Sequence, residues 1–164
     1  MSMYRNFSNL EVVKNIDFVL RSKAAKIYLL ACEYPKEPLL ETAEYLVQNL
    51  ADVYKHKILI LDFDPTRSSG TTQYQNIQSL DFLSTEDPNG LNIYTTECLN
   101  HYDYIFVLPH IKMNLDRTEI PNLKLDSSFL MRTKKSVSPV ASRIMTKSLT
   151  DSQVDIAGLF YREA

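Results

Sequence analysis

Apolar residues in this chain follow two patterns, continuous runs and helical repeats, which alternate along the sequence. Continuous runs occupy Lys26 to Cys32, Lys57 to Asp62 and Tyr102 to Pro109, as in strands buried on both faces of a parallel sheet. Apolar positions recur at helical spacing from Leu10 to Leu20 and from Leu39 to Leu50, which predicts two amphipathic helices. The alternation predicts an α/β fold, a three-layer sandwich with a mostly parallel sheet.

The remaining segments have weaker patterns. Ser138 to Leu149 carries apolar residues at helical spacing. Thr66 to Asn92 contains clusters of turn-forming residues, among them Asp87 to Gly90, which predict loops around a weak helix. Three short segments rich in strand-forming residues predict further strands: Leu91 to Thr95, Leu125 to Arg132 and Val154 to Tyr161.

Length and composition are those of an ordinary globular domain. The 164 residues favour one domain over residues 1–164, and hydrophobic and charged residues make up 45% and 23% of the chain. A net charge of −2 without a basic run gives no reason to expect a nucleic-acid partner. Two cysteines without a signal peptide predict reduced thiols in a cytoplasmic protein. No apolar run approaches the ~20 residues that cross a bilayer, so attachment to the inner membrane would require a partner.

The turn after the first predicted strand is where an α/β protein could bind phosphate. A phosphate-binding loop needs glycines, whose backbone amides can all point inward, and a lysine that reaches the phosphates. Here Cys32 to Thr42 contains no glycine, Pro38 removes an amide donor, and Lys36 is the only cation. Three glutamates, including Glu37, would repel a triphosphate. The residues therefore do not predict an ATP site.

Three segments together carry a family resemblance. Pro35 to Thr42 forms the turn, Ile58 to Arg67 joins an apolar strand to two aspartates and an arginine, and Tyr102 to Tyr104 opens a later strand. They resemble three motifs of the cytoplasmic ATPase domain of bacterial tyrosine kinases that regulate capsule and exopolysaccharide synthesis, within the ParA/MinD-like P-loop ATPases. The resemblance implies a P-loop NTPase-like fold. It also defines a degenerate nucleotide site at Lys36, Glu37, Leu39, Leu40, Asp62, Asp64 and Arg67.

Leucines stand where this resemblance implies polar groups. Leu39 replaces the phosphate-binding lysine, Leu40 the metal-binding hydroxyl, and Leu108 the carboxylate of the third motif. Positioning and charge neutralisation supply nearly all the catalysis of phosphoryl transfer. We therefore expect no catalytic residue and no cofactor, and a pseudo-ATPase in place of a kinase.

The resemblance implies a role that does not need catalysis. Such a domain would be a cytoplasmic accessory or regulatory subunit of a bacterial exopolysaccharide synthesis or export system. Its partner would be a membrane-embedded component of that system or an active ATPase of similar fold, and a homodimer is a further option.

Two alternatives remain open from the residues. Asp62 to Thr66 resembles the first motif of haloacid-dehalogenase-type phosphatases, in which Asp62 would attack phosphorus and Asp64 would act as general acid and base. A second alternative is a regulator that binds nucleotide without hydrolysing it. The histidines, His56, His101 and His110, show no ligand spacing, so no metal site is predicted.

Overall fold

The computed structural model describes nine helices and strands in about three-fifths of the chain. The structure describes residues 9–32, 39–63, 77–79, 88–109, 124–133, 143, 146–147, 149–151 and 153–162. In chain order the elements are α1 (Asn9–Ser22), β1 (Ile27–Cys32), α2 (Leu39–Tyr54), β2 (Ile58–Asp62), β3 (Ile77–Ser79), α3 (Pro88–Cys98), β4 (Tyr104–Leu108), β5 (Ser127–Thr133) and β6 (Ile156–Arg162).

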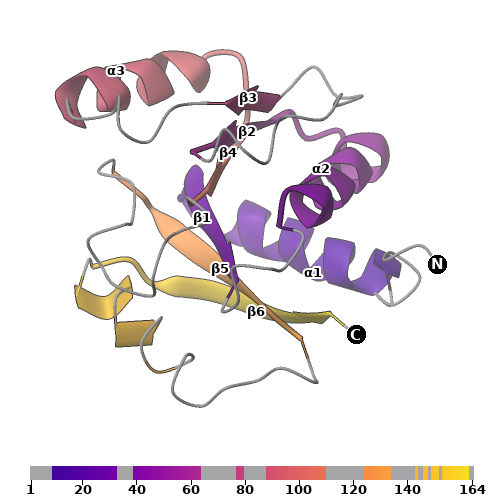
Figure 1. Cartoon of the computed structure of the whole chain (residues 1–164). Coiled ribbons are helices and arrows are strands. Elements are labelled where there is room, and N and C mark those ends of the chain that lie inside the picture. The colour runs from indigo at the N-terminus through magenta and orange to yellow at the C-terminus, as the bar shows by residue number, and fades with distance from the viewer. Residues whose placement is uncertain are drawn as a thin grey trace.

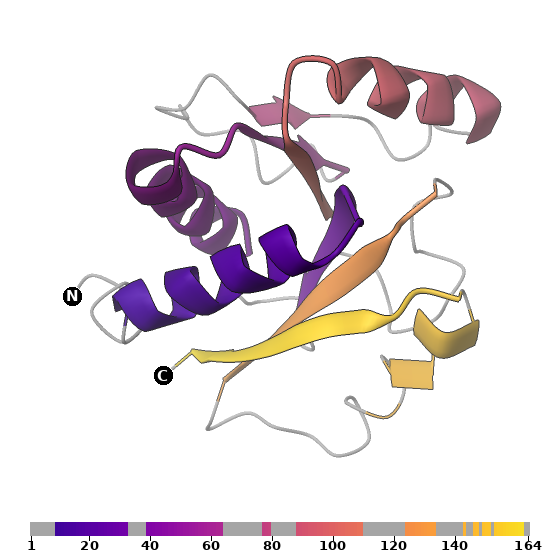
Figure 2. The same ribbon diagram turned by 180° about the vertical axis from the view of Figure 1, so that it is seen from behind.

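The described strands form one six-stranded sheet in the order β3-β2-β4-β1-β5-β6, and every pair in it is parallel. Helices α1 and α2 lie on one side of the sheet, and α3 and the helical residues before β6 lie on the other (Figure 1). The view from behind shows α1 and α2 side by side (Figure 2). This arrangement confirms the predicted three-layer α/β fold.

Two hydrophobic clusters fill the space between these layers. One joins α1 and α2 to alternate residues of the strands, such as Leu30, Ile60 and Phe106. The other joins α3 to the intervening residues, such as Leu29 and Val107. Because β1, β2 and β4 are buried along almost their whole length, their sequences are continuously apolar, as both faces of a covered parallel strand require.

Most predicted elements are confirmed, but the strand predicted at Leu91 to Thr95 is wrong. These residues belong to helix α3, which begins at Pro88, so the prediction of a loop at Asp87 to Gly90 is also wrong from Pro88 onward. Leu91, Thr95 and Cys98 are buried at helical spacing, and Asp followed by Pro is a typical helix start. The run LNIYT suggested a strand because it is short and contains only two residues of the buried helical face, Leu91 and Thr95.

Strand β3 is a second correction, because Thr66 to Asn92 was predicted to contain only loops and a weak helix. Ile77–Ser79 pairs with the end of β2. A strand of three residues is too short to produce a periodic pattern of its own. Of the helix predicted at Ser138 to Leu149, the structure describes residues 143, 146–147 and 149, and all of them are helical.

Aspartates tie together the amino ends of the strands. Asp126 Oδ2 accepts hydrogen bonds of 2.9 Å from the backbone N–H groups of Lys26 and Ile27, at the start of β1. Asp103 Oδ2 accepts one of 2.9 Å from the N–H of Lys57, before β2. Each bond joins the segment before one strand to its neighbour in the sheet, so it fixes where the strands begin relative to one another.

Candidate functional site

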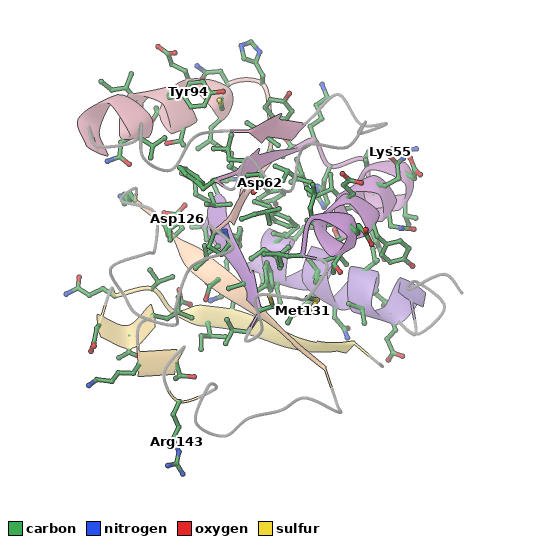
Figure 3. The ribbon with its side chains drawn as sticks, in the orientation of Figure 1. Lys55, Asp62, Tyr94, Asp126, Met131 and Arg143 are labelled. Carbon is green, nitrogen blue, oxygen red and sulfur yellow. The ribbon has the colours of Figure 1, made fainter. Side chains whose placement is uncertain are left out.

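The candidate site lies at the carboxyl ends of β2 and β4, where open α/β sheets bind ligands. Asp62 and Leu108 are the last residues of these strands and lie directly opposite each other in the sheet. The N–H of Phe63 donates a 3.0 Å hydrogen bond to the Leu108 carbonyl, which extends the pairing by one residue. The side chains of Asp62 and Leu108 are fully buried, and Asp62 lies near the middle of the molecule (Figure 3). The pairing of β2 with β4 therefore brings these two motif positions together.

The first turn of α2 brings two more predicted residues to the same place. Leu39 and Leu40 begin the helix and are 1% and 8% exposed. Both belong to the same hydrophobic cluster as Leu108. We call Leu39, Leu40 and Leu108 the leucine cluster. At the three positions where the motif comparison implies a lysine, a hydroxyl and a carboxylate, the chain thus has buried hydrocarbon.

The other predicted residues of the degenerate site are not placed. Lys36, Glu37, Asp64 and Arg67 lie outside the described residues. What the described part of this edge offers chemically is the Asp62 carboxylate beside apolar side chains. Within that same part of the chain, no group of three or more His, Cys, Asp and Glu side chains could hold a metal ion.

A second polar cluster, which the sequence did not predict, lies near the opposite end of α1 and α2. Asp17 on α1 is 1% exposed, and its Oδ1 lies 2.6 Å from His56 Nε2. Its Oδ2 accepts a hydrogen bond of 2.9 Å from Arg21 Nε. Burial raises the pKa of the Asp17 carboxyl, but hydrogen bonds and charges from Arg21 and His56 outweigh burial, so this pKa lies below its usual value.

This cluster connects elements, and the Arg21 side chain at its edge is 61% exposed. The His56 and Tyr104 rings pack edge to face with their centroids 5.4 Å apart. The Tyr104 hydroxyl donates a 3.2 Å hydrogen bond to the Leu20 carbonyl. Asp17 therefore joins α1 to the segment between α2 and β2. The available sequence signal was an aspartate between Ile16 and Leu20 on the apolar face of α1, because a buried carboxylate must have partners.

Comparisons with known proteins place the fold in a class. No protein-family model matches the chain, and no curated protein does. Among solved structures it is similar to the BceF tyrosine kinase domain, with a TM-score of 0.69 and 15% identity over 93% of this chain and 74% of that one. The kinase domain of Escherichia coli tyrosine kinase ETK gives 0.65 and 10% over 100% and 80%. A ParA family ATPase from Chlorobium tepidum gives 0.55 and 12% over 85% and 73%.

These likenesses show that the chain has a fold similar to that of bacterial tyrosine kinase domains and ParA-type ATPases. This is the fold that the motif resemblance implied. At such low identity the likeness extends to the fold alone. None of the helices in the described part of the chain is both long and apolar enough to cross a membrane.

Proposed function

We propose that this protein is a catalytically inactive pseudo-ATPase, which acts through protein contacts as an accessory or regulatory subunit of a bacterial exopolysaccharide synthesis or export system. The observation that carries the proposal is the burial of the leucine cluster at the carboxyl edge of the sheet. A phosphoryl-transfer site needs charge and water-binding groups at this edge.

A triphosphate carries several negative charges. Its transfer requires cations and hydrogen-bond donors that neutralise the phosphate oxygens. Leu39, Leu40 and Leu108 can offer neither. A phosphate placed against these three side chains would lose hydration without gaining hydrogen bonds from them, which is unfavourable for a charged group.

The pathway part of the proposal rests on similarity. The motifs resemble those of tyrosine kinases that regulate capsule and exopolysaccharide synthesis, and the solved neighbours include bacterial tyrosine kinase domains. The proposed partner is a membrane-embedded component of such a system or an active ATPase of similar fold. Through that partner the protein would lie at the inner membrane.

Calorimetric titration tests the absence of a nucleotide site. The purified protein is titrated with ATP and ADP, with and without Mg²⁺, and a BceF-type kinase domain serves as the positive control. We expect no binding heat and no thermal shift for this protein. Magnesium-dependent binding would overturn the pseudo-ATPase assignment, and binding without hydrolysis would favour a nucleotide-binding regulator.

A second assay tests the phosphatase alternative. Hydrolysis of a generic phosphate ester with Mg²⁺ is compared between the wild type and Asp62→Asn. We expect no turnover by either protein, because a nucleophile must reach solvent-borne substrate and Asp62 is fully buried. Turnover that disappears in Asp62→Asn would establish the phosphatase and exclude the proposal.

Copurification tests the partner. The tagged protein is expressed in a bacterium that carries an exopolysaccharide system, and its membranes are cross-linked and solubilised. We expect a synthesis or export component, or its ATPase, to copurify in stoichiometric amount. Enrichment of neither one would overturn the pathway assignment.

A further inference from the structure

We infer that the leucine cluster holds the first turn of α2 on the sheet without any ligand, so that this end of the helix has one conformation whether or not nucleotide is present. The inference concerns the regulation of the proposed site. It rests on the proposed function only in taking nucleotide to be absent from that site.

The first turn of a helix is ordinarily its weakly held part. Its first four N–H groups have no partner within the helix, and helix ends fray for this reason. In α2 the first turn is instead more buried than the last turn. Leu39 and Leu40 are 1% and 8% exposed at the start of the helix, whereas Val53 near its end is 52% exposed.

On the side of the sheet, Leu108 belongs to the same hydrophobic cluster as Leu39 and Leu40. Leu108 is the last residue of β4 and is 0% exposed. Thr42 in the first turn of α2 and Ala43 directly after it are also fully buried. The first turn is therefore buried at Leu39, Leu40 and Thr42, while Glu41 is exposed.

This arrangement has a consequence for regulation. A surface that is ordered only by bound nucleotide changes when the nucleotide is hydrolysed or exchanged. A first turn fixed by buried leucines has no such dependence. A partner that depends on the position of this helix end would therefore find it unchanged with and without ATP.

Amide hydrogen exchange of α2 tests the inference. The amides of residues 43–46 donate to carbonyls of the first turn, residues 39–42, and those of residues 51–54 donate to residues 47–50. Exchange is measured in the wild type with and without Mg²⁺-ATP, and rates are divided by those of the unfolded chain. We expect residues 43–46 to be at least as protected as residues 51–54, with less than a twofold change on adding nucleotide.

Two matched variants separate local packing from overall stability. Leu39→Ala removes a leucine of the cluster and keeps high helix propensity, and Leu50→Ala makes the same truncation at a fully buried position further along α2. Both are measured where circular dichroism shows them folded. We expect Leu39→Ala to raise exchange at residues 43–46 at least tenfold relative to residues 51–54, and Leu50→Ala to leave that ratio unchanged or lower it.

The opposite results would overturn the inference. Wild-type residues 43–46 that exchange tenfold faster than residues 51–54, or that become protected only with Mg²⁺-ATP, would show that the turn is not fixed by the leucines. Equal effects of the two variants on the ratio would do the same. ATP binding with unchanged exchange would refute the proposed function and leave this inference standing, whereas fast exchange without ATP binding would refute only the inference.

Discussion

The two ends of the sheet differ in the kind of group that they bury. At the carboxyl edge, Leu39, Leu40 and Leu108 join the hydrophobic cluster around one carboxylate, Asp62. At the amino edge, aspartates bind backbone amides and basic side chains, as Asp17 does with Arg21 and His56. Open α/β sheets bind ligands at the carboxyl edge, whereas the side-chain hydrogen bonds of Asp17, Asp103 and Asp126 lie near the amino edge.

On the proposed function, the fold is kept while the chemistry of its usual site is replaced. The amino edge needs its polar groups because strand starts and helix ends present unpaired backbone groups. The carboxyl edge needs polar groups only if it binds a polar ligand. Five substitutions test this contrast and the contacts around it, beginning with the one expected to change stability most.

Leu108→Asp would put a second carboxylate opposite Asp62 at the carboxyl edge. We expect it to lower the free energy of unfolding by about 4 kcal/mol, because the introduced charge is buried without a partner. Urea denaturation at pH 7 measures the loss. Leu108→Met is the control and should cost less than about 1.5 kcal/mol, since it nearly conserves volume. A stable Leu108→Asp protein would mean that this edge accommodates charge.

Asp17→Asn would remove the charged centre of the amino-edge cluster. We expect a loss of about 2–3 kcal/mol, because hydrogen bonds from charged groups to a buried carboxylate are among the stronger ones. Asp52→Asn is the control and should change stability by less than about 0.5 kcal/mol, since Asp52 accepts its side-chain bond from Gln48 in solvent. Equal losses of stability in the two variants would show that the buried Asp17 carboxylate contributes no more than the exposed Asp52 carboxylate.

The Asp17 effect should also depend on pH. The pKa of Asp17 is lowered in the folded protein, so its contribution is fully present above the ordinary carboxyl pKa of about 3.9 and is lost as pH falls through the lowered value. The difference in stability between the wild type and Asp17→Asn should therefore be constant above about pH 5 and shrink below about pH 4. Acid unfolding of both proteins checks this.

Lys55→Gly should stabilise the end of α2. Lys55 has a φ of 62°, and its N–H donates to the Ala51 carbonyl while that of His56 donates to Leu50, as in a helix that ends in a left-handed residue. Glycine adopts this conformation without the cost of a Cβ atom, so we expect a gain of about 1 kcal/mol. Thermal unfolding measures it. Lys55→Ala is the control, and an equal gain there would point to the lysine side chain instead.

Two tyrosine substitutions give the smallest effects and test whether partnered polar groups matter. Tyr104 donates a hydrogen bond to the Leu20 carbonyl, so Tyr104→Phe should cost about 1 kcal/mol. The hydroxyl of Tyr28 is buried without a hydrogen-bond partner in the described residues, so Tyr28→Phe should be neutral or slightly stabilising. Denaturant midpoints compare the two. A larger loss for Tyr28→Phe would reveal a partner for its hydroxyl.

Helices and strands in the longer apolar segments could be predicted correctly from the sequence, whereas the element in the short segment Leu91 to Thr95 could not. Lys26 to Cys32 and Leu39 to Leu50 are long enough for their periods to separate strand from helix, and the structure has β1 and α2 there. Leu91 to Thr95 covers little more than one helical turn, so its composition suggested a strand where α3 lies. For the site, the sequence predicted that Asp62 ends a buried strand and that Leu108 replaces a carboxylate, but it predicted neither that they lie opposite each other nor the burial of the leucines.

By itself the sequence determined the alternation of helices and strands, and with it the class of fold, because buried parallel strands and amphipathic helices have different hydrophobic periods. Only the tertiary structure decided which distant residues meet. Asp62 lies opposite Leu108 because β2 and β4 pair in one register, and Asp17 reaches His56 across 39 positions of the chain. Such contacts depend on strand order and on the packing of helices over the sheet, and the period of a single segment does not encode either.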